Sequence, residues 1–251
     1  MQKILLIVFL AAAFPATAQI VNIESKRMQT DSVGWKGSVN AAMSLTQNTQ
    51  KIFGVNLGAH LQYKTSNDRG LWLILGQYGF LKSGGQKFIS NSIGHIRYNR
   101  KLSNVIRWEV FGQLQYNLIT QIKLRSLLGT GPRFRIVKKE KFRLYAASLF
   151  MYENEKELTT PVVVHNDFRS SSYVSFTIIP RENIEIISTT FYQPLMKQFS
   201  DFRILNQIVF AVKATEGFSM SLNWDYLYDR FPSGAAPRTT YSFSAGIIHK
   251  L

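Results

Sequence analysis

Hydrophobic and polar residues alternate with a period of two along most of the chain after residue 34. The clearest stretch is Phe218–Tyr228, where aromatic and aliphatic side chains occupy every second position and small polar side chains or aspartate lie between them. Because successive side chains of a β-strand point to opposite faces, this pattern predicts long strands with one apolar and one polar face.

Twelve such strands are predicted. They cover about residues 35–46, 51–64, 70–81, 87–102, 105–118, 123–137, 142–154, 168–179, 184–192, 201–214, 218–228 and 238–250, with 71–80 and 168–179 alternating least cleanly. Strands of this length exceed the roughly 5–6 residues usual in globular sheets and match the roughly 9–11 residues that cross a bilayer at a tilt.

The connections and the aromatic residues favour a membrane protein. Short turns alternate with longer connections at 155–167, 193–200 and 229–237, and aromatic side chains gather near strand ends. Both features are typical of outer-membrane barrels. We therefore predict one all-β domain over residues 35–251, a single up-and-down antiparallel transmembrane β-barrel of about twelve strands with its longer loops outside the cell. A soluble β-sandwich or lipocalin-like barrel stays open as an alternative, because alternation alone does not tell which face points inward.

The first eighteen residues predict export. Lys3 precedes the apolar run Ile4–Phe14, and Ala16–Ala18 has the small-x-small pattern of a signal-peptidase site. This run is too short for a spanning helix, which needs roughly 20 apolar residues. We predict a signal peptide over residues 1–18, a periplasmic segment over 19–34, and localisation in the cell outer membrane.

The charge and composition of the chain limit the chemical classes of partner that we expect. The chain has 30 Lys and Arg against 15 Asp and Glu, a net charge of +15, and no cysteine. The absence of cysteine excludes disulfides, a thiol nucleophile and cysteine-bound zinc. A basic protein favours acidic partners. Because export disfavours nucleic acid, we expect outer-membrane lipid, small anionic solutes, and the barrel assembly machinery during biogenesis.

The polar face of several predicted strands carries arginines. If the apolar face meets lipid, these side chains point into the lumen together with one glutamate, and Lys123 shares their face. The candidates for lumen anion binding are Arg97, Arg107, Glu109, Arg125, Arg133, Arg135 and Arg203. Guanidinium groups bind phosphate and carboxylate through two parallel hydrogen bonds, in a bidentate geometry. The alternative is a packed interior in which the arginines pair with Glu109 and with amide side chains.

Two neighbouring glycines and a few histidines and acids complete the candidate chemistry. Gly129 and Gly131 are predicted to accommodate a bulky neighbouring side chain or a bend in the strand.

His60 shares the lumen face with Ser38 and Ser44, which is the minimum for a nucleophilic hydrolase. Glu153, Glu155 and Glu157 form either a charged strand tip or a calcium site, and His165 falls in a predicted loop. We expect no catalytic residue, no metal and no cofactor.

Several short motifs resemble a known family. These are Arg97–Leu102, Arg107–Gln113, Arg125–Phe134, Tyr192–Pro194, Asp201–Arg203, and Tyr228-Asp229 followed by Pro232. In this order they resemble domain-of-unknown-function family 481, the salt-induced outer-membrane protein group, over about residues 35–251. The resemblance implies an outer-membrane β-barrel with no established activity.

Three functions stay open from the sequence. The first hypothesis is a non-enzymatic barrel with a structural or envelope-adaptation role. The second is a narrow pore or binding barrel for small anionic solutes that uses the lumen arginines. The third is a lipid-modifying barrel enzyme.

Overall fold

A computed structural model describes residues 33–47, 51–67, 69–84, 86–215 and 218–249. The predicted signal peptide and all but the last two residues of the predicted periplasmic segment lie outside these ranges. The described residues contain no helix that could cross a membrane.

Twelve antiparallel strands form one sheet in the order of the sequence. Their bounds are β1 Gly34–Gln47, β2 Lys51–Lys64, β3 Gly70–Ser83, β4 Gln86–Lys101, β5 Ile106–Asn117, β6 Ile122–Lys138, β7 Phe142–Glu157, β8 Val164–Arg181, β9 Ile184–Leu195, β10 Gln198–Lys213, β11 Phe218–Asp229 and β12 Thr239–His249. The predicted all-β, up-and-down fold is confirmed.

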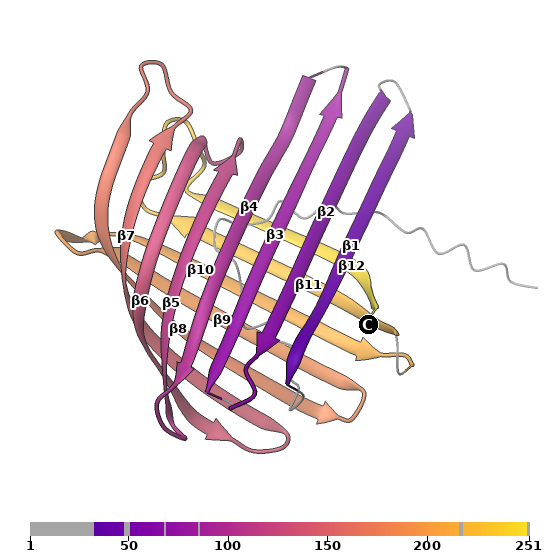
Figure 1. Cartoon of the computed structure of the whole chain (residues 1–251). Helices are drawn as coiled ribbons and strands as arrows, with labels where there is room; N and C mark the ends of the chain where they lie inside the picture. Colours follow the sequence, from indigo (N-terminus) through magenta and orange to yellow (C-terminus); the bar gives the residue numbers. More distant parts are fainter. Residues whose placement is uncertain (1–32, 48–50, 68, 85, 216–217, 250–251) are drawn as a thin grey trace, which may run out of the picture.

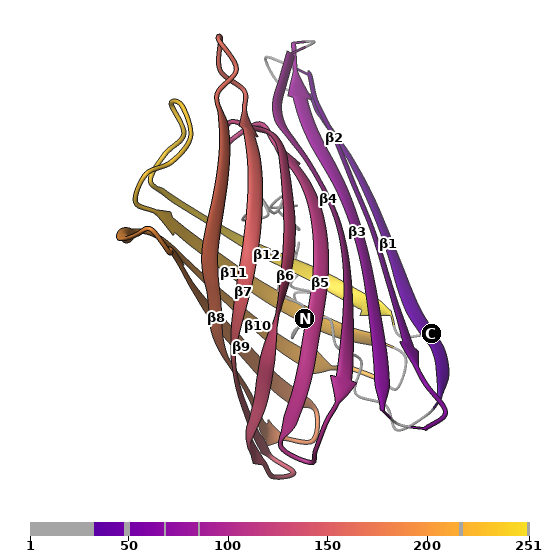
Figure 2. The ribbon, with the colours of Figure 1, turned by 60° about the vertical axis from the view of Figure 1, so that its left-hand side comes forward.

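The sheet is curled into a half-barrel (Figure 1), with β1–β4 in front, β5–β8 at the curved side and β9–β12 behind. Among the described residues, β1 and β12 each pair on one side only and are the two edges of the sheet. We call the end with connections 65–69, 102–105, 139–141, 182–183 and 214–217 the turn end, and the opposite end the loop end. The β7–β8 hairpin ends in a narrow projection at the loop end (Figure 2).

The apolar face of the sheet points outward. On β1, Val39 and Met43 are 75% and 76% exposed, and Trp224 and Leu222 on β11 are also exposed. The opposite parity is buried and largely polar, as at Asp225. A soluble sandwich or lipocalin-like barrel would bury its apolar face, so that alternative is wrong. A continuous exposed apolar surface is what contact with lipid requires.

Outward aromatic side chains form two belts, one at each end. At the turn end, Trp35 packs against Tyr63 with ring centroids 4.9 Å apart, and Trp72 packs against Tyr98 at 4.6 Å. At the loop end the belt comprises Phe150, Tyr152, Phe168, Tyr192, Phe202 and Tyr228. Amphipathic rings prefer the boundary between hydrocarbon and headgroups. The belts therefore mark the two membrane boundaries that the sequence predicts.

Two of the predicted long loops are shorter than expected. β7 and β8 pair as far as Lys156 and Val164, and β9 and β10 continue to Leu195 and Gln198. The connections shrink to 158–163 and 196–197, whereas 230–238 stays long. The polar residues at these strand ends gave no apolar alternation, although the backbone ladder continues through them.

The glycines of β6 allow close approach of neighbouring groups. Phe111 on β5 lies opposite Gly129, where its ring occupies the space that a Cβ would need. A Cβ on Gly131 would lie 2.7 Å from the Cα of Leu149 on β7. The predicted role of Gly129 in accommodating a bulky neighbour is therefore confirmed.

Gly131→Ala should destabilise the fold, because the new methyl group meets β7 backbone that cannot retreat. We expect a loss of about 1–3 kcal/mol in the free energy of unfolding, measured by urea titration of the protein in lipid vesicles with tryptophan fluorescence. Gly76→Ala is the control, since a Cβ there meets nothing within 4 Å. Equal effects of the two substitutions would contradict the packing described.

Candidate functional site

Five of the seven predicted lumen residues are buried on the inner face of the sheet. These are Arg97 on β4, Glu109 on β5, Arg125 and Arg133 on β6, and Arg203 on β10, none more than 5% exposed. Arg107 and Arg135 are half-buried nearer the turn end. The polar strand face thus provides inward side chains as predicted, and their partners decide what they can bind.

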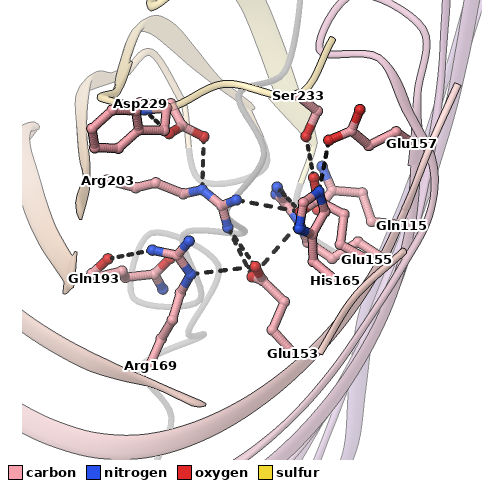
Figure 3. A network of polar contacts seen from close by, with 12 residues as sticks. Gln115, Glu153, Glu155, Glu157, His165, Arg169, Gln193, Arg203, Asp229 and Ser233 are labelled. Atoms are coloured by element: carbon pink, nitrogen blue, oxygen red, sulfur yellow. Dashed lines mark hydrogen bonds and ion pairs between the residues drawn. The ribbon is translucent and has the colours of Figure 1, made fainter. Parts of the chain in front are cut away.

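Arg203 is the centre of a network near the loop end (Figure 3). Its Nη1 donates to Glu153 at 2.8 Å and its Nε to Asp229 at 2.7 Å. Its Nη2 lies 3.3 Å from a carboxylate oxygen of Glu155. Since Glu153 and Glu155 belong to β7 and Arg203 to β10, these contacts cross the lumen between strands that are not neighbours in the sheet.

Two further arginines complete this cluster. Arg125 Nε donates to Glu155 at 2.6 Å. Arg169 on β8 donates through Nε to Glu153 at 3.3 Å and through Nη1 to Asp201 at 3.0 Å. We call the set the acid–arginine network; it consists of Arg125, Arg169, Arg203, Glu153, Glu155, Asp201 and Asp229.

Every arginine of the acid–arginine network is paired with carboxylates of the protein. Three guanidinium groups face four carboxylates, and all but Asp201 are almost fully buried. A buried charge is tolerated only when it is paired and hydrogen-bonded. Arg125 and Arg203 are therefore committed to protein carboxylates, which lowers their capacity to bind an added anion.

The β11–β12 loop is joined to this network. The hydroxyl of Ser233 in that loop donates to Glu155, and Ser233 is itself buried. A Cβ on Gly234, which has a positive φ of 53°, would lie 3.1 Å from Thr159 of the β7–β8 connection. The loop thus folds inward over the loop end of the half-barrel.

An apolar layer fills the inner face next to the network. It comprises Phe111, Leu127, Ala147, Leu149, Met151, Tyr173, Phe191, Leu205 and Leu227, which come from β5–β11. Tyr173 and Phe191 pack with ring centroids 5.1 Å apart. The inner face is therefore not uniformly polar. Along β7 the inward side chains are first aliphatic, at Leu149 and Met151, and then acidic from Glu153 onward.

Glu109 organises a second polar cluster toward the turn end. It is fully buried, accepts a hydrogen bond from Arg97 at 2.8 Å and another from the hydroxyl of Tyr173 at 3.0 Å. Arg133 Nε lies 3.8 Å from its second oxygen, and the Arg133 guanidinium stacks 3.7 Å from the ring centroid of Tyr145. We call Glu109, Arg97 and Arg133 the Glu109 cluster, in which two guanidinium groups share one carboxylate.

Comparison with known proteins assigns the family. The family described as "Protein of unknown function, DUF481" matches residues 39–250. The chain belongs to the DUF481 family. No curated protein matches it significantly.

Two solved outer-membrane barrels share the fold of this DUF481 protein. The NanC porin matches with a TM-score of 0.53 and 10% identity, over 86% of this chain and 99% of its own. The translocator domain of the autotransporter NalP from Neisseria meningitidis matches with a TM-score of 0.51 and 8% identity, over 90% and 92%. At these identities the likeness concerns the fold alone.

Several sequence predictions for this DUF481 protein need correction. Lys123 is exposed rather than in the lumen, because a β-bulge between Ile122 and Leu124 changes the parity there. Glu153 and Glu155 are buried network members, not a solvated strand tip. His165 lies on β8, where its Nε2 is 2.7 Å from Glu157, and not in a loop.

The sequence reasoning missed three members of the network. Arg169 lies on β8, where serines occupy both faces and obscure the parity. Asp201 and Asp229 fall in the short motifs that carry the family resemblance, which was the available signal for them. Within the described part of the chain, no three acidic or histidine side chains are placed to hold a metal ion.

The hydrolase candidates are only partly described. Ser38 lies directly opposite His60 in the β1–β2 ladder, and His60 is buried on the inner face. The side chain of Ser44 lies outside the described residues. The ladder places one serine beside the histidine, and hydrolysis stays a hypothesis.

Arg203→Met should strongly destabilise the protein, since it takes the cation away from the buried carboxylate of Asp229 and removes the shortest ion pair of Glu153. We expect a loss of about 3–5 kcal/mol in the free energy of unfolding in lipid vesicles. Arg143→Met is the control, because the Arg143–Glu185 pair is partly exposed, at 14% and 33%, and should cost less than about 1 kcal/mol. A similar cost for both variants would show that the network contributes no more than a surface pair.

Proposed function

We propose that this DUF481 protein is a non-enzymatic structural barrel of the bacterial outer membrane, with a lumen occupied by its own side chains. The fold and the outward apolar face support a membrane position, and the likeness to outer-membrane barrels supports this membrane in particular. Insertion would then proceed through the barrel assembly machinery, and lipid would be the main partner. A role in adapting the envelope fits a protein that fills the membrane without transporting through it.

The observation that carries this proposal is the contact across the lumen between β10 and β7. Arg203 reaches Glu153 at 2.8 Å, so no free channel passes between these two side chains. Next to them, Met151 and Leu205 are completely buried in the apolar layer. Small barrels fill their interiors with side chains in this manner. The arginines of the acid–arginine network are already paired with carboxylates of the protein, which weakens their attraction for an anionic solute.

A pore for small anionic solutes is the second candidate, and the Glu109 cluster favours it. Arg97 and Arg133 share a single carboxylate there, and Arg107 lies opposite Arg133 in the β5–β6 ladder. Among the described residues, the turn end of the lumen is thus richer in positive charge than the loop end. One of the structures that shares the fold is titled a porin, which motivates a direct test of conduction.

The purified protein should show no ion conductance when it is inserted into planar lipid bilayers, because the network and the apolar layer occupy the lumen. Co-flotation with vesicles verifies insertion separately, so that a failure to insert is not mistaken for a lack of conductance. Discrete channels with an anion-selective reversal potential would contradict the structural proposal and favour the pore. In that case Arg97→Gln should reduce the anion selectivity, whereas Arg143→Gln should not.

A further inference from the structure

A β-bulge at the loop end of β6 brings a second lysine beside Lys156. Ile122 pairs with Glu157 and Leu124 with Lys156, so Lys123 is the extra residue between them. Ile122 is completely buried, whereas Lys123 and Leu124 are both exposed. Bulges are known to redirect a side chain without ending the strand. Here the bulge gives the outer surface a lysine that regular alternation would have turned inward.

Lys156 lies directly across from this bulge on β7, and it too is exposed. It shares its parity with Tyr152 and Asn154, while Glu153, Glu155 and Glu157 take the inward positions. The acids of β7 are thereby separated from its lysine by the sheet itself. Neither Lys123 nor Lys156 makes an ion pair with another described residue, so two adjacent ammonium groups share one outward surface.

Neutral hydrogen-bonding groups continue this surface toward the membrane. Asn154 Nδ2 donates to Asn166 Oδ1 at 2.7 Å, and the Tyr152 hydroxyl donates to the same oxygen at 3.0 Å. Directly beyond them Tyr152 packs on Phe168 with ring centroids 5.3 Å apart, and Phe150 on Phe168 at 5.1 Å. The lysines thus lie just outside the aromatic belt, at the depth where lipid headgroups begin.

We propose that Lys123 and Lys156 bind the phosphate of a lipid in the adjacent leaflet, whose acyl chains lie along Phe150 and Phe168. Lysine is a common phosphate ligand, and basic side chains next to a membrane surface are attracted to anionic lipids. Two observations favour a lipid over free phosphate. The aromatic surface next to the lysines can contact acyl chains, and two exposed lysines in water do not enclose a small ion. The outward position excludes a lumen solute as the occupant.

The test uses the full chain in neutral detergent and three probes, followed by native mass spectrometry. Dioleoyl phosphatidic acid carries both phosphate and acyl chains, dioleoylglycerol lacks the phosphate, and glycerol 3-phosphate lacks the chains. The variant is Lys123→Gln with Lys156→Gln. The control is Lys139→Gln with Lys141→Gln, which removes the same charge from exposed positions at the turn end.

We expect phosphatidic acid to bind the parent protein better than either other probe. The Lys123→Gln, Lys156→Gln variant should lose at least about tenfold in affinity for it, since both charge-assisted contacts are gone, while the control keeps its affinity. Unchanged binding by the variant would overturn the proposal. So would equally tight binding of glycerol 3-phosphate that the same variant abolishes, because the ligand would then be free phosphate.

Circular dichroism of each variant verifies folding before binding is compared. Both lysines are exposed and carry no ion pair among the described residues, so their replacement should leave the strand signal intact. The proposal is independent of whether the lumen conducts, because the two lysines lie on the opposite face of the sheet from the acid–arginine network.

Discussion

The absence of water in the hydrocarbon of a membrane is the constraint on which this structure depends. Backbone groups must be paired within the sheet, and charged side chains must either leave the hydrocarbon or turn inward. From β2 to β11 the chain meets this requirement with antiparallel ladders on both sides of each strand, and the apolar face points outward. Once the arginines and glutamates point inward, they lie close together in a confined interior and must neutralise one another.

This second requirement explains how the lumen is divided. At the loop end, Arg125, Arg169 and Arg203 meet Glu153, Glu155, Asp201 and Asp229, so the carboxylates outnumber the guanidinium groups by one. At the turn end, Glu109 pairs with both Arg97 and Arg133. Aliphatic and aromatic side chains separate the two clusters. The net charge of +15 therefore does not come from the loop-end network, and outward lysines such as Lys123 and Lys156 contribute to it instead.

Strand number, order and parity were predictable from sequence, because a face that meets lipid must be apolar at every second residue. The sequence-based placement of individual side chains was wrong at a β-bulge and near a strand end, where contact with lipid does not determine the pattern. Lys123 was misplaced because a single bulged residue changes the parity without changing composition. Glu153 and Glu155 were taken for a strand tip, because the inward positions that precede them, Leu149 and Met151, are apolar like the outer face. The contact of Arg203 with β7 joins strands far apart in the sequence, and periodicity contains no information about it.

The orientation of the sheet can be measured directly, because the chain has no cysteine and any introduced cysteine is labelled alone. Nitroxide labels placed one at a time along β11, in protein reconstituted into lipid vesicles, report the accessibility of each position to dissolved oxygen, which concentrates in lipid. The structure predicts high oxygen accessibility at Met220, Leu222 and Trp224 and low accessibility at Ser221 and Asp225, with a period of two. The opposite phase, or no alternation, would contradict an apolar face turned to lipid and a polar lumen within.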